Sequence, residues 1–167
     1  MPIPEFVREL RAAIGPRPLW ISGITAVVVD ERGRLLLGRR SDTGRWALIA
    51  GIIDPGEQPA DAAARECWEE TAVRVVPERL TSLTVSTPRV HANGDQAQYL
   101  ELTFLCRAEG GEARVNDDES LEVGWFELDA LPAELDDSAR YRIGCALSGR
   151  PETAFAFDPA LLDAVAR

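Results

Sequence analysis

Residues 51–73 read GIIDPGEQPADAAARECWEETAV, which is the pattern G-x5-E-x7-R-E-U-x-E-E-x-A-U, with U a bulky apolar residue. Glu66, Glu69 and Glu70 stand at positions i, i+3 and i+4, so a helix would carry three carboxylates on one face. A second stripe of the same helix is small or apolar and is expected to pack: Ala60, Ala64, Cys67 and Thr71. Because like charges this close repel, the pattern predicts a bound cation, and carboxylate oxygens suit hard divalent ions such as Mg2+.

This stretch resembles the Nudix box, the signature of hydrolases that cleave nucleoside diphosphates linked to another moiety. The matching positions are Gly51, Glu57, Arg65, Glu66, Cys67 (in an apolar position), Glu69, Glu70 and Val73. The chain departs from the pattern at Ala72, where the family has glycine. Since that glycine would close the helix in a left-handed conformation, we expect alanine to cost on the order of 1 kcal/mol or to shift the helix end.

The resemblance implies roles for the charged residues of the box. It places a metal ion on Glu66, Glu69 and Glu70, with Glu57 supporting through water. Mg2+ is the expected ion and Mn2+ the alternative. We expect the ion to bind diphosphate oxygens and to lower the pKa of an attacking water, while Arg65 pairs with Glu57 or Glu69 and fixes a carboxylate rotamer.

The catalytic proton acceptor is left open between the box and a later loop. Within the box, the catalytic candidates are Glu69, Glu70 and Arg65, with the arginine as an orienting group. Glu119 precedes the predicted strand 123–128, a region from which Nudix enzymes often recruit a further glutamate as ligand or base. Its acidic neighbours are expected to be surface charges, and so is the single histidine: Asp117, Asp118, Glu122 and His91.

Substrate contacts are assigned to four residues near the box. Arg39 and Arg40 end a predicted strand and could grip phosphate, although solvation at a strand edge is the plain alternative. Trp46 could stack on a base, although core packing is the commoner role for an aromatic residue before Gly51. Gly51 itself is assigned to the substrate-binding set as the first residue of the box.

The order of predicted elements indicates an α/β fold. The expected helices are residues 4–14, 58–71, 138–147 and 159–166, and the expected strands are residues 21–30, 34–39, 46–50, 73–76, 80–86, 97–107 and 123–128. Strands interleaved with helices favour an α/β/α sandwich around a mixed sheet, which is also the fold that the resemblance implies. We expect one domain over residues 1–167, with its core at about residues 20–130.

Composition restricts the partners. A chain of 167 residues with 46% hydrophobic residues can bury one sizeable core. The net charge of −10 argues against a nucleic-acid polymer as partner, because phosphate backbones require a basic face. We expect no membrane span and no signal peptide, since apolar runs are short and the first dozen residues are mixed in charge. The three cysteines are widely spaced, which favours a reducing cytoplasm over disulfides or a zinc site.

The substrate class stays open at this point. Pro88 falls fifteen residues after the box, as in ADP-ribose-cleaving members, whereas short members often hydrolyse nucleoside triphosphates. Both readings have a small-molecule nucleotide as substrate. A third is a Nudix-fold sensor or interaction domain without turnover, although such proteins typically lose the Arg-Glu-x-x-Glu-Glu core. The apolar stretches 4–14 and 155–165 are expected to pack against the core or a second subunit, and a homodimer is expected.

Overall fold

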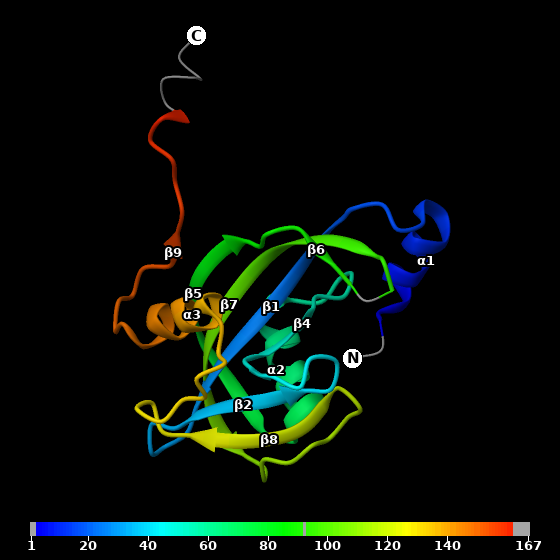
Figure 1. The fold of residues 1–167 in the computed structure, drawn as a ribbon. Helices are drawn as coiled ribbons and strands as arrows, with labels where there is room; N and C mark the ends of the chain where they lie inside the picture. The colour runs from blue at the N-terminus through cyan, green and yellow to red at the C-terminus, as the bar shows by residue number, and fades with distance from the viewer. Residues whose placement is uncertain (1–2, 92, 162–167) are drawn as a thin grey trace.

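A computed structural model describes residues 3–91 and 93–161, and Figure 1 shows its arrangement. The helices of the described residues are α1 (Glu5–Ile14), α2 (Pro59–Thr71) and α3 (Asp137–Leu147). The strands are β1 (Leu19–Val29), β2 (Leu35–Arg40), β3 (Trp46–Ala47), β4 (Ile49–Ile52), β5 (Arg74–Val85), β6 (Arg89–Val90), β7 (Gln96–Gly110), β8 (Ser120–Phe126) and β9 (Ala154–Phe155). No helix in this part of the chain is long and apolar enough to cross a membrane.

The strands form one mixed sheet. Its main path runs β3-β2-β1-β7-β5-β9, with β4 paired to β1, β6 to β7 and β8 to β2. The central pair, β1 and β7, is parallel and in register from Leu19 opposite Ala97 to Val29 opposite Arg107. β5 runs antiparallel to β7, and β4 antiparallel to β1. The mixed sheet that the sequence predicts is therefore confirmed.

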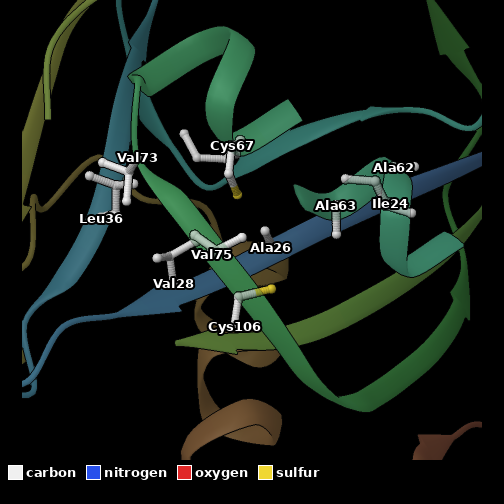
Figure 2. Packing of buried hydrophobic residues seen from close by; sticks show 11 residues of the cluster. Ile24, Ala26, Val28, Leu36, Ala62, Ala63, Cys67, Val73, Val75 and Cys106 are labelled. Atoms are coloured by element: carbon white, nitrogen blue, oxygen red, sulfur yellow. The ribbon is translucent and has the colours of Figure 1, made fainter. Parts of the chain in front are cut away.

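Helices cover both faces of this sheet (Figure 1), so β1, whose successive side chains point in opposite directions, is buried on both sides. One set of its residues packs under α2, as Figure 2 shows: Ile24, Ala26 and Val28 of β1 with Ala62, Ala63 and Cys67 of α2. The opposite face carries Val27, which packs with residues of α3 such as Ala139 and Ile143. Near the start of β1, Val7 of α1 packs with Ile21 and Ala97. This confirms the α/β/α sandwich.

Three strand predictions differ from the structure. Residues 46–50, expected as one strand, form β3 on β2 and β4 on β1, because the chain changes neighbour at the buried residue Leu48. Residues 73–76 and 80–86, expected as two strands, form the single strand β5, in which irregular pairing near Pro77 absorbs the missing donor. The two-residue strands β6 and β9 carry no periodic pattern and were not expected.

Helix α2 ends as the sequence suggests. Ala72 adopts the left-handed conformation, with φ 55° and ψ 20°, and its amide donates to the Trp68 carbonyl. The segment after β7 supplies further donors to the end of the helix: Arg114 N bonds to Thr71 O at 3.0 Å, and the Asn116 side chain bonds to Trp68 O at 2.9 Å. The carbonyls that a helix end leaves free are thus satisfied by a distant part of the chain.

The two terminal stretches behave differently. Within residues 4–14, Glu5–Ile14 form α1, which packs on the core through Val7, as expected. Of the stretch 155–165, Phe155 is 72% exposed and Phe157 is also exposed, so these two side chains do not pack on the core of the single chain. Most of the predicted helix 159–166 lies outside the described residues.

Candidate active site

Helix α2 buries two of the three box glutamates that it carries. Only 1% of Glu66 and 8% of Glu70 is exposed, whereas Glu69 is exposed. The packing stripe predicted from the sequence is therefore displaced around the helix. Cys67 and Thr71 are buried as expected, but Ala60 and Ala64 are only partly buried. The observed buried stripe also includes Ala62, Ala63, Glu66 and Glu70. Small alanine side chains bring this side of α2 close to the sheet, which takes the carboxylates with it.

Glu66 reaches across strand β4 into space left by Gly51. A Cβ atom at Gly51 would lie 2.0 Å from Glu66 Oε1, so a side chain there would overlap the carboxylate. Glu66 Oε1 accepts a hydrogen bond from Arg65 Nη1 at 2.8 Å. Glu66 Oε2 is buried and has no hydrogen-bond partner among the described residues. Gly51 thus makes room for a carboxylate rather than contributing a group of its own.

Both buried carboxylates have raised pKa values. Burial raises the pKa of Glu66 to about 7, against the opposing effect of the Arg65 guanidinium. Burial, with the neighbouring charges of Glu66 and Asp117, raises the pKa of Glu70 to about 8, although Arg40 acts in the opposite direction. Two desolvated carboxylates side by side favour a cation between or beside them.

Arg65 joins the acidic residues of the box. Its Nε and Nη2 atoms donate to the two oxygens of Glu57, at 2.8 and 2.9 Å, in a bidentate pair. Nη1 donates to both Glu66, at 2.8 Å, and Glu69, at 3.1 Å, and Nη2 also donates to the Ile52 carbonyl. The bond from Arg65 is the main reason that the pKa of Glu57 is lowered. The pairing expected for Arg65 is present with both Glu57 and Glu69.

The carboxylate oxygens of these residues are suitable ligands for a divalent cation, but they are not grouped around a common point. In the part of the chain that the structure describes, no three Asp, Glu, His or Cys side chains are grouped so as to hold a metal ion. Arg65 lies between Glu66 and Glu69 and holds both carboxylates. However, the unpartnered Glu66 Oε2 and the buried Glu70 are hard oxygen donors with raised pKa values, as expected of groups that a cation would stabilise.

The two strand-end arginines have different surroundings, with a register shift between them. Arg40 is close enough to Glu70 for each to shift the pKa of the other, and its guanidinium binds Asp42 through two hydrogen bonds. Arg39 instead bonds to the Gly44 carbonyl and lies 3.6 Å from Glu122. Of the two arginines, only Arg40 is therefore retained as a candidate phosphate contact.

Trp46 packs in the core cluster beneath α3. Its ring meets that of Phe126 edge-on, with centroids 4.7 Å apart, and it is partly buried among the residues of that cluster. Packing against Phe126 and the core therefore accounts for Trp46, and base stacking is not needed to explain this side chain.

The acidic loop before β8 is anchored close to the box. Asn116 N bonds to Glu70 O, and Ser41 N bonds to Glu119 O at 2.7 Å. Glu119 is partly buried, whereas Asp118 and Glu122 are exposed. Asp117, expected as a surface charge, is partly buried and raises the pKa of Glu70. The sequence offers no signal for this proximity, which depends on how the segment after β7 returns to the end of α2.

Residues 20–146 match the model of the NUDIX domain family. The chain belongs to the Nudix family. Nudix hydrolases act on phosphoanhydride bonds and generally use divalent metal ions. The identified family is thus the one that the box suggests.

Known Nudix proteins align with much of the length of this chain. It is 36% identical to a MutT-like protein of Streptomyces ambofaciens over 144 residues, which cover 86% of this chain and 87% of that protein. It is 26% identical to an ADP-ribose pyrophosphatase structure from Streptococcus suis, with a TM-score of 0.62, covering 83% of this chain and 98% of that one. It is also 36% identical to the NAD-capped RNA hydrolase NudC of Chromobacterium violaceum, covering 64% of this chain but only 38% of that protein.

Proposed function

We propose that this protein is a metal-dependent nucleotide pyrophosphohydrolase, which cleaves the phosphoanhydride of a nucleoside diphosphate linked to another moiety. The observation that carries the proposal is the pair of buried carboxylates, Glu66 and Glu70, beside the Arg65 cluster within a complete set of box carboxylates. Desolvated carboxylates of this kind are costly to the fold, and a cation shared with substrate phosphates would offset the cost.

The residues of the box would have separate roles in binding the metal ion and in holding the ligands. Glu66, Glu69 and Glu70 would hold a divalent ion, Mg2+ first and Mn2+ as the alternative. The bound ion supplies neutralisation of phosphate charge and a more acidic water. Arg65 fixes the rotamers of the box carboxylates and keeps Glu57 ionised beside them.

Two residues outside the helix complete the proposed site. Arg40, next to Glu70, would bind a phosphate oxygen once it exchanges its contact with Asp42 for the substrate. Glu119, on the loop anchored to Ser41, is the proposed extra ligand or proton acceptor.

Two substrate classes are supported about equally. Similarity to a putative 8-oxo-dGTP diphosphatase of Bacillus subtilis, 29% identical over 114 residues, favours a nucleoside triphosphate, and the similar ADP-ribose pyrophosphatase favours a nucleoside diphosphate sugar. A similar protein is named for NAD-capped RNA, but the net charge of −10 favours a small nucleotide here over a nucleic-acid polymer. We further propose a single domain in a reducing cytoplasm, in keeping with three free cysteine thiols.

A nucleotide-binding domain without turnover is the second candidate. Loss of activity is expected to remove one of the box carboxylates or Arg65, and all of them are present. Hydrogen bonds from Arg65 also hold Glu57, Glu66 and Glu69 as one cluster.

A substrate screen tests the proposal. Purified protein is incubated with deoxynucleoside triphosphates, ADP-ribose and other dinucleotides, with Mg2+ or with excess EDTA. We expect Mg2+-dependent release of a nucleoside monophosphate from at least one of them. Binding of nucleotides without any turnover in Mg2+ or Mn2+ would favour the second candidate instead.

A further inference from the structure

An open cleft of about 740 Å³ lies between α1 and the exposed side of α2. Its walls include Arg65 and Glu69 of the box, Asp117 of the acidic loop, Trp68 of α2, and Phe6 and Arg8 of α1. The volume falls within the range of small-molecule sites. Because the cleft shares Arg65 and Glu69 with the candidate metal site, anything bound there would lie beside the reacting phosphates.

Helix α1 is a fixed wall of this cleft. Val7 is buried against the sheet, and Arg11 ties the C-terminal half of the helix to the core. The guanidinium of Arg11 donates to the Gly15 carbonyl at 3.1 Å, to the Arg17 carbonyl at 2.5 Å and to the Gln96 carbonyl at 2.6 Å, and it pairs with Asp95. Arg8, one turn earlier, is exposed and reaches the cleft. The backbone of Arg8 is therefore held beside the cleft by the anchored helix.

The opposite wall presents an aromatic ring that packing does not account for. Trp68 is 45% exposed on the outer side of α2, while its backbone carbonyl is held by Asn116. A half-exposed indole next to a cluster of carboxylates and across from a guanidinium offers a stacking surface and a cation to the same ligand. Nucleotides carry both matching groups, an aromatic base and phosphate oxygens.

We propose that this cleft binds the nucleoside part of the substrate, with the base against Trp68 and with Arg8 on a ribose or phosphate oxygen. The inference rests on the proposed hydrolysis and extends it, because it assigns the specificity of the site to α1 and to the outer side of the box helix. Phe6, partly buried, adds a second aromatic side chain to the lining of the cleft.

The test compares Trp68→Ala and Arg8→Ala with two controls outside the cleft. Trp20 is also an exposed tryptophan, at 57%, and Arg32 is an exposed arginine on the turn after β1. With ADP-ribose and dGTP as probes, both cleft variants should raise KM about tenfold and leave kcat within about twofold, as predicted for loss of a stacked base at Trp68 and of a charged contact at Arg8. Trp20→Ala and Arg32→Ala should leave both constants unchanged.

Direct binding separates this inference from the proposed function. In a Glu70→Gln background, titration calorimetry with ADP-ribose and Mg2+ should show binding that Trp68→Ala weakens about tenfold and Trp20→Ala does not. This result would uphold the cleft even if the wild-type protein hydrolysed neither probe. Hydrolysis by the wild type with KM unaffected in Trp68→Ala and Arg8→Ala would overturn the cleft and leave the proposed function standing. Absence of binding in every variant would overturn the cleft as well. If Trp68→Ala does not fold, as judged by circular dichroism, Trp68→Leu keeps the apolar bulk and must show the same rise in KM.

Discussion

The carboxylate of Glu66 occupies the space in which a side chain on Gly51 would lie, 2.0 Å from the position of its Cβ atom. This relationship links strand β4 to the box helix and fixes the most deeply buried acid of the candidate site. Substitution of Gly51 therefore changes the site without removing any of its charged groups.

Gly51→Ala should push Glu66 out of its position beside Arg65. We expect kcat to fall at least about tenfold, because metal ligands and their supports tolerate little displacement, and the free energy of unfolding to fall by about 1–3 kcal/mol through overpacking. Gly144→Ala is the matched control, since a Cβ atom there meets nothing within 4 Å on helix α3. Kinetics and chemical denaturation of both variants make the comparison. Full activity in Gly51→Ala would show that the position of Glu66 is immaterial.

Stability of the metal-free protein should fall as pH rises from about 5 to about 8.5. The pKa values of Glu66 and Glu70 are about 7 and about 8 in the folded protein, against 4.5 for an ordinary glutamate. In this window the folded state binds more protons than the unfolded state, so the free energy of unfolding decreases with pH, by on the order of 5 kcal/mol at about 1.4 kcal/mol per pKa unit. Carboxylates with lowered pKa, such as Glu57, lose their contribution only at lower pH.

Mg2+ should reverse this loss at high pH, because it binds the ionised pair in the folded state only. Thermal melts at about pH 5 and about pH 8.5, with Mg2+ or EDTA, measure the effect. The Glu70→Gln variant should show a flatter dependence on pH and a smaller response to Mg2+. A melting temperature that is unchanged by both pH and Mg2+ would argue against a cation at these carboxylates.

Arg65→Lys should impair turnover while conserving charge. Lysine cannot hold Glu57 in a bidentate pair and reach Glu66 and Glu69 at the same time. We expect kcat to fall about 10- to 100-fold, as for other groups that orient metal ligands. Arg107→Lys is the control, since Arg107 also bridges two glutamates, Glu78 and Glu109, but on an exposed edge. Equal effects of the two substitutions on kcat would remove Arg65 from the site.

The acidic loop provides a series of graded substitutions. Glu119→Gln should lower kcat with little change in KM, and Asp117→Asn should lower the pKa of Glu70 by removing a neighbouring negative charge. Asp118→Asn and Glu122→Gln, at exposed positions, should behave as wild type. The pH profile of kcat at saturating Mg2+ reports all four variants. A Glu119 variant that matches the Asp118 variant would return Glu119 to the surface.

Self-association is expected from two exposed aromatic residues, one at the end of β9 and one just after it. Phe155 and Phe157 remain uncovered in the single chain, and β9 lies at the edge of the sheet. Light scattering at micromolar concentration should give a mass of twice 18.3 kDa, and Phe155→Ser with Phe157→Ser should reduce it. A wild-type mass of 18.3 kDa would exclude the dimer under these conditions.

The box could be predicted from the sequence because its chemistry is local. The spacing of Glu66, Glu69 and Glu70 fixes their relative places on a helix, and apolar runs indicate most of the strands along the chain, so the fold class and the box helix are correct. The burial of Glu66 and Glu70 could not be predicted, because it depends on how closely α2 approaches the sheet over Ala62 and Ala63.

Contacts between distant segments could not be predicted from the sequence for the same reason. Asp117 influences Glu70 only because the chain returns to the end of α2 after β7. Similarly, Trp68 and Arg8 line one cleft only because Arg11 and Val7 fix α1 beside the box helix. Periodicity indicates which residues share a face of one element, but not which faces of two elements meet.

The most direct test of the central claim is the turnover of Glu70→Gln beside wild type on the best substrate of the screen. The account predicts hydrolysis by wild type that needs Mg2+ or Mn2+, and a kcat lower by about 100-fold or more in the variant with the fold retained. Hydrolysis that continues at full rate in excess EDTA, or a Glu70→Gln variant as active as wild type, would contradict it.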